Sequence, residues 1–480
     1  MSYETVIGLE VHAQLKTESK LFSGSAIRFG AAPNSQTSFI DAGFPGTLPA
    51  LNRQAVIMAI QFGLAVNATI NPRSIFARKN YFYPDLPKGY QISQHEHPIV
   101  AHGKLDIELN QGKVNTIAIA RAHLEEDAGK SVHDAHHTYT GIDLNRAGTP
   151  LLEIVTEPCL YSSEEAIAYL KTIHQLLKFL GICDGNMQEG SFRCDVNISL
   201  RPTGSTTLGT RTELKNLNSF RFIEKAIAYE EARHADLLSQ GTQITQETRL
   251  FCPDREITVL MRSKENENDY RYFPDPDLPP VCIDEALLHE AKTSMPALPQ
   301  AIKESLKSTA HLANDDIQFL LNNKATYDYF MAVKHQCLAD EKILVNWLKG
   351  TYSRALNDNA LSFENPPIKA SDLATLLNAL ADKTISNSMA KDIFQELWQT
   401  KTPIADILAK DSFKPLDNDT LLINLVESLI TNFPEQVNEY RAGKVQLLGF
   451  FVGKIMKETQ GKADPPRVSK LLKEHLEQKK

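Results

Sequence analysis

The amino-acid sequence predicts an α+β protein in which a sheet with interspersed helices is followed by a purely helical part. Up to about residue 290, short β-prone runs alternate with turns rich in Gly, Asn, Pro and Ser. The link at residues 201–209 contains one Pro and two Gly and is typical of a hairpin, which favours antiparallel pairing. Beyond the Pro-dense segment 274–280, apolar residues recur at helical spacing instead.

In the first part of the chain, one helix is marked at both ends. Ser162 and Glu165 form a capping-box pattern, and Gly181 follows the last residue of an apolar stripe. The predicted strands are residues 105–109, 114–125, 194–201 and 207–215.

The second part of the chain is predicted to be helical to its end. A helix is expected to start with Ser371 as its cap, and a second apolar stripe runs from Ile385 to Leu397. Pro403 and Pro415 mark a further boundary near residue 408. We therefore expect three domains, at residues 1–292, 293–407 and 408–480.

Length and composition indicate a globular protein. A chain of 480 residues suffices for about three domains, and 42% hydrophobic with 23% charged residues is typical of folded proteins. The longest uncharged stretch, residues 54–72, is interrupted by Gln, Asn, Gly and Pro, which predicts no membrane span. The six cysteines include no C-x-x-C pair, and no basic leader precedes the first strand. These features predict a cytoplasmic protein.

The charge is unevenly distributed. The net charge is −8, which argues against a protein coated in basic surface for nucleic acid. Residues 441–480, however, contain ten Lys or Arg and four Asp or Glu, a net charge of +6 that leaves −14 for the first 440 residues. The chain thus combines an acidic body with a basic tail.

Mixed acidic and basic rows follow the predicted strands. Residues two apart in a strand share a face, and Asp, Glu, His and Arg recur together on such faces. The rows are Glu10 and His12; Arg121, His123, Glu125 and Asp127; Arg193, Asp195, Asn197, Ser199 and Arg201; and Arg211, Glu213 and Lys215.

These rows fit two interpretations. Carboxylates bind Mg²⁺ together with substrate phosphates, and Arg or Lys neutralises a transferring phosphoryl group. On the pattern alone, the preferred interpretation is a solvated face with surface ion pairs worth about 0–1 kcal/mol each. The sequence contains no G-x-x-x-x-G-K-[ST] or G-x-G-x-x-G loop, so any ATP would bind without a Walker cradle.

Residues 79–90 interleave aromatic rings with lysines in a Pro-punctuated loop. Such rings could stack on unpaired bases while the lysines hold phosphates. The preferred interpretation is a rigid loop that its rings pack onto the sheet.

Eight ordered blocks resemble one protein family, the B subunits of the glutamyl/aspartyl-tRNA amidotransferase (the GatB family of the GatCAB complex). The resemblance runs from the first strand to residues 461–463 in the tail, and so many blocks in order are highly specific. The blocks are residues 8–12 (GLEVH), 78–85 (RKNYFYPD), 123–130 (HLEEDAGK), 145–148 (NRAG), 151–155 (LLEIV), 191–197 (SFRCDVN), 212–220 (TELKNLNSF) and 261–265 (MRSKE).

The resemblance implies an ATP-dependent transamidation. In this family, Glu on tRNA(Gln) or Asp on tRNA(Asn) is phosphorylated at its side-chain carboxylate, and ammonia then displaces phosphate. The B subunit performs both steps in a cradle built from a large antiparallel sheet with helices. The A subunit is a glutaminase that supplies ammonia through a channel, the small C subunit clamps the two, and the helical and tail domains hold the tRNA.

The resemblance also implies roles for individual residues. It would place Mg²⁺ and the ATP phosphates at five catalytic and metal-binding positions, and it gives four further candidates for ATP or phosphate contacts. The basic tail would meet the tRNA backbone through five residues, with salt-dependent affinity. The three sets are Glu10, His12, Glu125, Asp195 and Glu213; Ser191, Arg193, Lys215 and Asn216; and Arg441, Lys444, Lys454, Lys457 and Lys462.

The sequence departs from the family pattern in one loop. Many members carry four zinc-binding cysteines where this chain has Ser23, Ser25, Ser38 and Asp41. Serine hydroxyls are poor zinc ligands compared with thiolates, so we predict no zinc and a loop held by packing. In the tail, Asp464 stands where Asn is commoner.

Two other function classes share these features, and the sequence leaves some points open. They are a Mg²⁺-dependent phosphohydrolase or nuclease, which would need no ammonia, and a non-catalytic tRNA-binding scaffold. The sequence does not choose between Glu-tRNA(Gln) and Asp-tRNA(Asn). It also does not separate the metal ligands from their neighbours Glu126 and Asp127, because strand parity can slip at a bulge.

Overall fold

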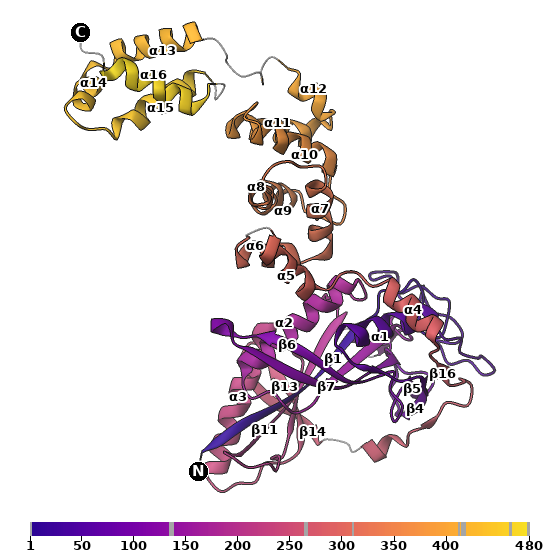
Figure 1. Ribbon diagram of the computed structural model, residues 1–480. Helices are drawn as coiled ribbons and strands as arrows, with labels where there is room; N and C mark the ends of the chain where they lie inside the picture. The colour runs from indigo at the N-terminus through magenta and orange to yellow at the C-terminus, as the bar shows by residue number, and fades with distance from the viewer. Residues whose placement is uncertain are drawn as a thin grey trace. The chain divides into compact units, whose positions relative to one another are not determined.

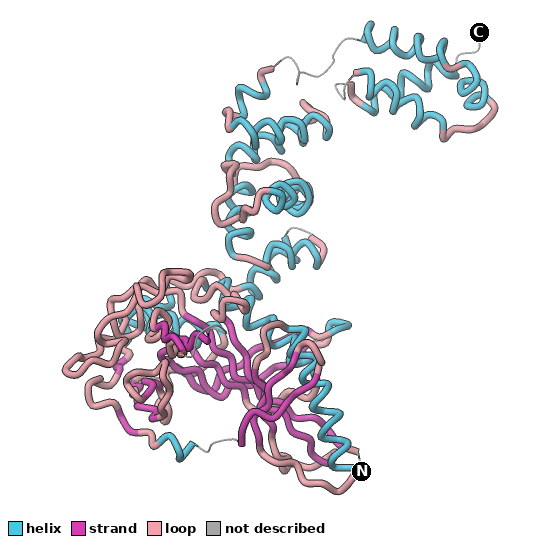
Figure 2. The backbone as a smooth tube through the Cα atoms, turned by 180° about the vertical axis from the view of Figure 1, so that it is seen from behind, coloured by secondary structure: helices cyan, strands magenta, loops and turns pink. Residues whose placement is uncertain are grey.

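The computed structural model describes residues 2–133, 139–263, 267–309, 312–410, 413, 419–459 and 463–477. The chain forms two compact units, Met1–Ala301 and Ile302–Lys480 (Figure 1). All strands of the described residues lie in the first unit, and the second is built from helices and loops (Figure 2). The predicted α+β class is confirmed, while the domain boundaries expected at residues 292 and 407 stay predictions.

A nine-stranded sheet organises the first unit. Its order is β14-β13-β12-β11-β1-β10-β7-β6-β2, and every neighbouring pair is antiparallel except β12 with β13. The strands are β1 Tyr3–Gln14, β2 Thr69–Ile70, β6 Val100–Glu108, β7 Val114–Glu126, β10 Pro150–Thr156, β11 Phe192–Pro202, β12 Thr212–Lys215, β13 Glu247–Cys252 and β14 Ile257–Ser263.

Three helices cover one face of this sheet. The helices α1 and α2 contact β6, and α3 contacts β11 and β14. Apolar side chains at alternate positions of the central strands, such as Leu9, Val11 and Val196, are buried in this core. The chemistry-bearing residues at the intervening positions therefore lie on the other face. The first unit's helices are α1 Arg53–Ala65, α2 Ser163–Leu180, α3 Phe220–Ser239 and α4 Glu285–Thr293, with short 3₁₀ turns η1 Asn110–Gly112 and η2 Glu267–Tyr270.

Smaller sheets lie beside the main sheet. In the order β15-β4-β5, three short strands form a sheet whose β5 contacts β7. The β3–β16 and β8–β9 pairs are antiparallel. Their bounds are β3 Arg73–Ser74, β4 Ala77–Asn80, β5 Tyr90–Ser93, β8 Lys130–His133, β9 Thr140–Asp143, β15 Phe273–Pro274 and β16 Val281–Cys282.

Both predicted ends of α2 are confirmed. The Ser162 hydroxyl accepts a hydrogen bond from the Glu165 backbone N–H at 3.1 Å. The Glu165 carboxylate accepts one from the Tyr161 N–H at 2.7 Å. Gly181 closes the helix in the left-handed region with φ of 73°.

Two sequence predictions are wrong in detail. The strand expected at 207–215 is confined to Thr212–Lys215, because the preceding segment passes close to β11: a Cβ on Gly209 would lie 2.0 Å from the Leu200 carbonyl oxygen. Arg211 therefore precedes the strand, is exposed and does not join the row of Glu213. Ser371 is not a cap, since its helix already begins at Ala370, with Lys369 at the N-cap position.

The rest of the chain is helical in its described residues, and none of the described helices is long and apolar enough to span a membrane. Residues from 422 to 476 form a hydrophobic cluster of their own, around Phe451, Ile455 and Leu472. The helices are α5 Pro299–Thr309, α6 Asn314–Leu321, α7 Lys324–Lys334, α8 Glu341–Trp347, the π-helical turn η3 Leu348–Tyr352, α9 Ser353–Asp358, α10 Ala370–Ala381, α11 Asn387–Thr400, α12 Ile404–Leu408, α13 Asp419–Asn432, α14 Pro434–Arg441, α15 Leu447–Glu458 and α16 Pro465–Glu477.

Candidate functional site

Strand register brings the chemistry-bearing residues together at the centre of the large sheet. On β1, Glu10 lies opposite Asp195 of β11, and His12 lies opposite Glu153 of β10. In turn, Glu153 lies opposite His123 of β7. Four adjacent strands thus carry acidic and imidazole side chains on one face.

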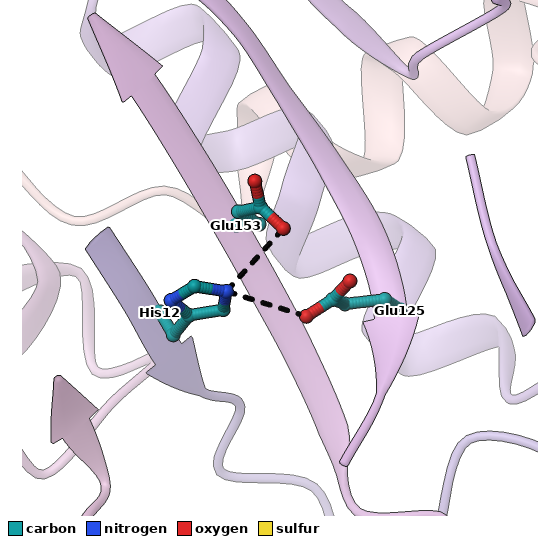
Figure 3. A group of neighbouring side chains, drawn as sticks. All are labelled: His12, Glu125 and Glu153. Carbon is teal, nitrogen blue, oxygen red and sulfur yellow. Dashed lines mark ion pairs between the residues drawn. The ribbon is translucent and has the colours of Figure 1, made fainter. Parts of the chain in front are cut away.

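His12, Glu125 and Glu153 form the first cluster, here termed the His12 group. The His12 Nε2 atom lies 3.3 Å from Glu153 Oε2 and 3.5 Å from Glu125 Oε1 (Figure 3). One ligand atom from each residue lies within 4.8 Å of the others. His123 supports this group from β7, with Nε2 at 3.4 Å from the same Glu153 oxygen. The three side chains point toward one another as ligands of one cation would.

Glu10, Asp195 and Glu213 form the second cluster, here termed the Glu10 group, which meets the same 4.8 Å criterion. The Asn197 amide donates to Glu10 Oε1 at 2.8 Å, and the Thr248 hydroxyl donates to Glu213 Oε2 at 2.7 Å. These bonds orient two of the three carboxylates. The five predicted catalytic residues are therefore divided between two groups. These groups are neighbours because Glu10 and His12 are two residues apart on β1.

The electrostatics of the two groups differ. Burial and the neighbouring acids Glu153 and Asp195 raise the pKa of Glu10. Burial lowers the pKa of His12, but the nearby Glu153 and Glu125 outweigh it and raise that pKa to about 9. The same balance raises the pKa of His123 to about 9. A divalent cation bound here would stabilise the closely spaced carboxylates of the two groups.

Basic side chains border both groups. The Lys215 ammonium pairs with Asp195 and lies 3.4 Å from Glu213 Oε1. Arg193 donates through Nη2 to the buried Asp127 at 2.8 Å, and its Nε is buried without a hydrogen-bond partner among the described residues. A buried N–H of this kind is costly unless an acceptor reaches it, and a substrate oxygen could be that acceptor.

The other two residues predicted to contact phosphate already form hydrogen bonds within the protein. Ser191 lies just before β11, and its hydroxyl donates to Asp184 at 3.3 Å. Asn216 follows β12 with φ of 65°, and its amide donates to the Phe251 carbonyl at 2.9 Å. Their contact with ATP stays a prediction.

Glu153 was not among the residues predicted for the site. It lies in the strand LLEIV, where apolar residues flank it on both sides, so no alternating row marks it. A single acid inside a buried strand is the signal that could have identified it. The structure also separates Glu126, which pairs with Lys88, and Asp127, which holds Arg193, from both groups.

The loop for which we predict no zinc is built around a buried ion pair. The fully buried Lys20 ammonium lies 3.1 Å from Asp41 Oδ2. The Ser23 hydroxyl donates to Asp41 at 3.0 Å, and the Ser38 N–H donates to it at 2.8 Å. Ser25 contributes its backbone carbonyl, which accepts from the Lys20 N–H at 2.9 Å. Polar contacts, besides the expected packing, thus hold this loop.

The predicted tRNA contacts in the tail differ in their surroundings. The Lys454 ammonium lies over the rings of Phe433 at 5.1 Å and Phe450 at 5.6 Å. Lys457, three residues further along α15, is exposed. Lys444 lies 3.2 Å from Glu439, and Arg441 donates to the Leu476 carbonyl at the end of α16 at 2.8 Å. Lys462 lies outside the described residues. Asp464 accepts the Val468 N–H through its backbone carbonyl at 2.9 Å, just before α16.

Comparison with known proteins gives one consistent result. Residues 5–289 match the family model of the GatB/GatE catalytic domain, and residues 328–476 match that of the GatB domain. Similar relatives, each named as the B subunit of an aspartyl/glutamyl-tRNA(Asn/Gln) amidotransferase, come from Legionella pneumophila strain Lens (61% identity), Thioalkalivibrio sulfidiphilus (51%) and Coxiella burnetii strain CbuG_Q212 (50%). Each alignment covers 99% of this chain and 100% of the relative.

Both matches extend over the parts of the chain that carry the site and the tail. The GatB/GatE catalytic domain model spans every residue of the His12 and Glu10 groups, and the second model spans α15 and all of α16 except Glu477. The comparisons support neither a phosphohydrolase nor a scaffold, since the named relatives are all amidotransferase subunits. The chain therefore belongs to the GatB family, the B subunits of aspartyl/glutamyl-tRNA(Asn/Gln) amidotransferases.

Proposed function

We propose that this chain amidates misacylated Glu-tRNA(Gln), Asp-tRNA(Asn) or both, in an ATP-dependent reaction on the face of its large sheet. It would act as the B subunit of a tRNA-dependent amidotransferase, a carbon–nitrogen ligase of protein biosynthesis. The observation that carries this proposal is the pair of neighbouring cation-binding groups bordered by Lys215 and Arg193. Such an arrangement suits phosphoryl transfer to a carboxylate.

The residues fit magnesium. The six side chains of the two groups supply five carboxylates and one imidazole, and oxygen donors are the ligands that Mg²⁺ prefers. His12, Glu125 and Glu153 would hold one ion, and Glu10, Asp195 and Glu213 would hold another. When bound, magnesium would neutralise phosphate charge and help to align the reacting oxygens.

In the proposed reaction, ATP first activates a carboxylate that ammonia alone cannot amidate. The side-chain carboxylate of the aminoacyl group attacks the γ-phosphorus, and ADP leaves. Ammonia then attacks the carbonyl carbon, phosphate leaves with the bridging oxygen, and an amide remains. The protein supplies no nucleophile: Arg193 and Lys215 would neutralise developing charge, and the rigid strands would hold the partners in line.

Partners would supply ammonia and substrate. The A subunit, a glutaminase, would release ammonia from glutamine, the small C subunit would join the complex, and tRNA would lie on the helical tail domain through Lys454, Lys457 and their neighbours. The relatives' name, which makes them B subunits of an aspartyl/glutamyl-tRNA(Asn/Gln) amidotransferase, supports a multisubunit enzyme.

Replacing glutamine by ammonium chloride tests the location of the chemistry, because ammonium bypasses the glutaminase. The complex with the A and C subunits would receive Glu-tRNA(Gln) or Asp-tRNA(Asn), Mg²⁺-ATP and ammonium. Asp195→Asn should abolish amide formation, whereas Asp236→Asn, the same change at an exposed position of α3, should preserve it. Amide formed at the wild-type rate by Asp195→Asn would overturn the proposal.

A further inference from the structure

Three basic residues, Arg78, Lys79 and Lys88, lie on or beside the three-stranded sheet of β15, β4 and β5, here termed the small sheet, and two of them pair with carboxylates. Arg78 of β4 donates to Asp275 at 2.8 Å and to Asp277 at 2.9 Å. Lys88 pairs with Glu126. Lys79 differs: its ammonium lies 4.8 Å from the ring centre of Tyr270 and 6.0 Å from that of Tyr81, and it makes no ion pair with a carboxylate of the described residues.

The backbone explains this difference. In β4, Arg78 and Lys79 are consecutive, so their side chains leave opposite faces of the strand. Arg78 pairs with the two aspartates on one face. Lys79 lies opposite Gln91 of β5, whose side chain donates to the Glu126 carbonyl of β7, so the face that carries Lys79 adjoins the large sheet. There the Ser93 hydroxyl of β5 donates to Glu125 at 3.4 Å, so the small sheet directly adjoins the His12 group.

Lys79 remains charged in this position. Burial lowers the pKa of Lys79, but the phenol of Tyr272 and the carboxylates Glu125 and Glu153 raise it above the usual value of a lysine. Tyr272 is itself held in place by stacking on His95, with ring centres 4.1 Å apart. The result is a charged ammonium that lies over the Tyr270 ring and forms no ion pair with a carboxylate of the described residues.

An anion would complete this arrangement. Glu125 and Glu153 suit a cation, and Lys79 interacts electrostatically with both, yet it forms no ion pair with a carboxylate of the described residues. An anionic group placed there could meet the bound cation with one oxygen and the ammonium with another, so both charges would stabilise it. The aromatic walls would strengthen the attraction by excluding water.

We propose that Lys79 binds an anionic oxygen of the substrates beside the His12 group. Two sources have this chemistry: the side-chain carboxylate that is to be amidated, and the γ-phosphate of ATP. The inference rests on the proposed function, and it assigns to the reaction a residue outside the five catalytic and four phosphate-binding candidates.

Steady-state kinetics of the complete complex, with ammonium as the amine donor, test this role. Lys79→Met keeps an unbranched, mostly apolar side chain but removes the ammonium, and it should lower kcat/KM for amidation about a hundredfold, the usual effect of losing one charged contact to a reacting group. Lys79→Arg restores the charge and should recover part of the loss. Lys104→Met, an exposed position on β6, should match wild type.

Separate titrations identify the anion. A raised KM for Glu-tRNA with an unchanged dissociation constant for ATP would assign Lys79 to the carboxylate, and weakened ATP binding would assign it to the phosphate. If Lys79→Met unfolds the protein, Lys79→Gln takes its place in the same assays.

Two results would overturn the inference. One is kcat/KM within twofold of wild type in the folded uncharged variant, Lys79→Met or its replacement Lys79→Gln. The other is a loss confined to Mg²⁺ activation, with both substrate constants unchanged. Wild-type complex that forms no amide would instead refute the proposed function itself.

Discussion

At the scale of single residues, the sheet face balances its negative charge with groups held at short distances. Glu153 is central to this balance, because both His12 and His123 lie within 3.4 Å of one of its oxygens. The two imidazoles hold the pKa of Glu153 well below its usual range, although burial alone would raise it. Glu153 should therefore be ionised and available as a ligand at neutral pH.

Glu153→Gln tests whether this carboxylate binds a cation. The amide keeps the shape but loses the charge, so the Mg²⁺ concentration that gives half-maximal amidation should rise at least about tenfold. Glu157→Gln, an exposed position just beyond the same strand, serves as the control. Equal Mg²⁺ dependence in the two variants would show that Glu153 is not a ligand.

The protonation of His12 should make cation binding depend on pH. Burial lowers its pKa, but Glu153 and Glu125 raise it to about 9 in the protein without metal. Since only the neutral imidazole binds a metal, the ion must displace a proton at pH 7. Affinity should increase as the pH rises from 7 towards 9 and level off above it. Calorimetry with Mn²⁺ at pH 7, in two buffers of different ionisation enthalpy, should show about one proton released by His12; no release would contradict this.

At the scale of elements, a buried ion pair stabilises the loop that precedes α1. Lys20, Asp41 and Ser23 are buried, and Lys20 and Ser23 both contact the Asp41 carboxylate. The Lys20 ammonium also donates to the Leu144 carbonyl at 3.1 Å. Gly148 allows this close packing, because at its φ of 82° a Cβ would lie 2.9 Å from Asp41 Oδ1. The buried Lys20–Asp41 ion pair and its hydrogen bonds therefore hold this loop.

Removing one partner of this pair should be costly. Asp41→Asn leaves the Lys20 ammonium buried without its counterion and should lower the free energy of unfolding by about 3 kcal/mol. Lys20→Met combined with Asp41→Leu should recover part of that loss, since no charge is then buried. Urea unfolding checks both, with the exposed Asp254→Asn as control. Zinc bound stoichiometrically to the purified protein, or stabilisation of wild type by added zinc, would contradict the account.

The same elements show what a sequence can predict. Period-two alternation correctly predicted that Glu10 and His12 share a face, and likewise Arg193 and Asp195, because one face of each strand packs on helices. It could not divide the predicted residues into two groups, since that depends on β1 lying between β10 and β11, a pairing across about 150 residues of chain. The sequence did not identify the roles of Lys79 and Lys20 for a related reason, because segments that are distant in the chain form their surroundings.

At the scale of the whole molecule, charge is divided along the chain. The first unit carries the acidic sheet face, and the tail carries the basic residues of α15 and its neighbours. Lys454 and Lys457 are three residues apart on α15 and so project from one side of the helix. Under the proposed function, tRNA attachment and chemistry would belong to different parts of the chain.

Reversing two tail charges tests that separation. Lys454→Glu with Lys457→Glu should raise the KM for aminoacyl-tRNA about tenfold or more and flatten its salt dependence, because two phosphate contacts are lost. Turnover at saturating tRNA should be unchanged. Lys104→Glu with Lys171→Glu makes the same charge change at exposed positions of the first unit and is the control. Lower turnover without a change in KM would place these lysines outside tRNA binding.

Isotope transfer tests the central claim, that the sheet face joins ATP to the carboxylate. Glu-tRNA(Gln) carrying ¹⁸O in both side-chain carboxylate oxygens would be amidated by the complex with Mg²⁺-ATP and ammonium. If the carboxylate attacks the γ-phosphorus, one labelled oxygen must leave with phosphate and one must remain in the amide. We predict that mass spectrometry will find one ¹⁸O in each inorganic phosphate formed during amidation, and that Asp195→Asn will form no such phosphate. Unlabelled phosphate released alongside the amide, or labelled phosphate from the variant at the wild-type rate, would contradict the account.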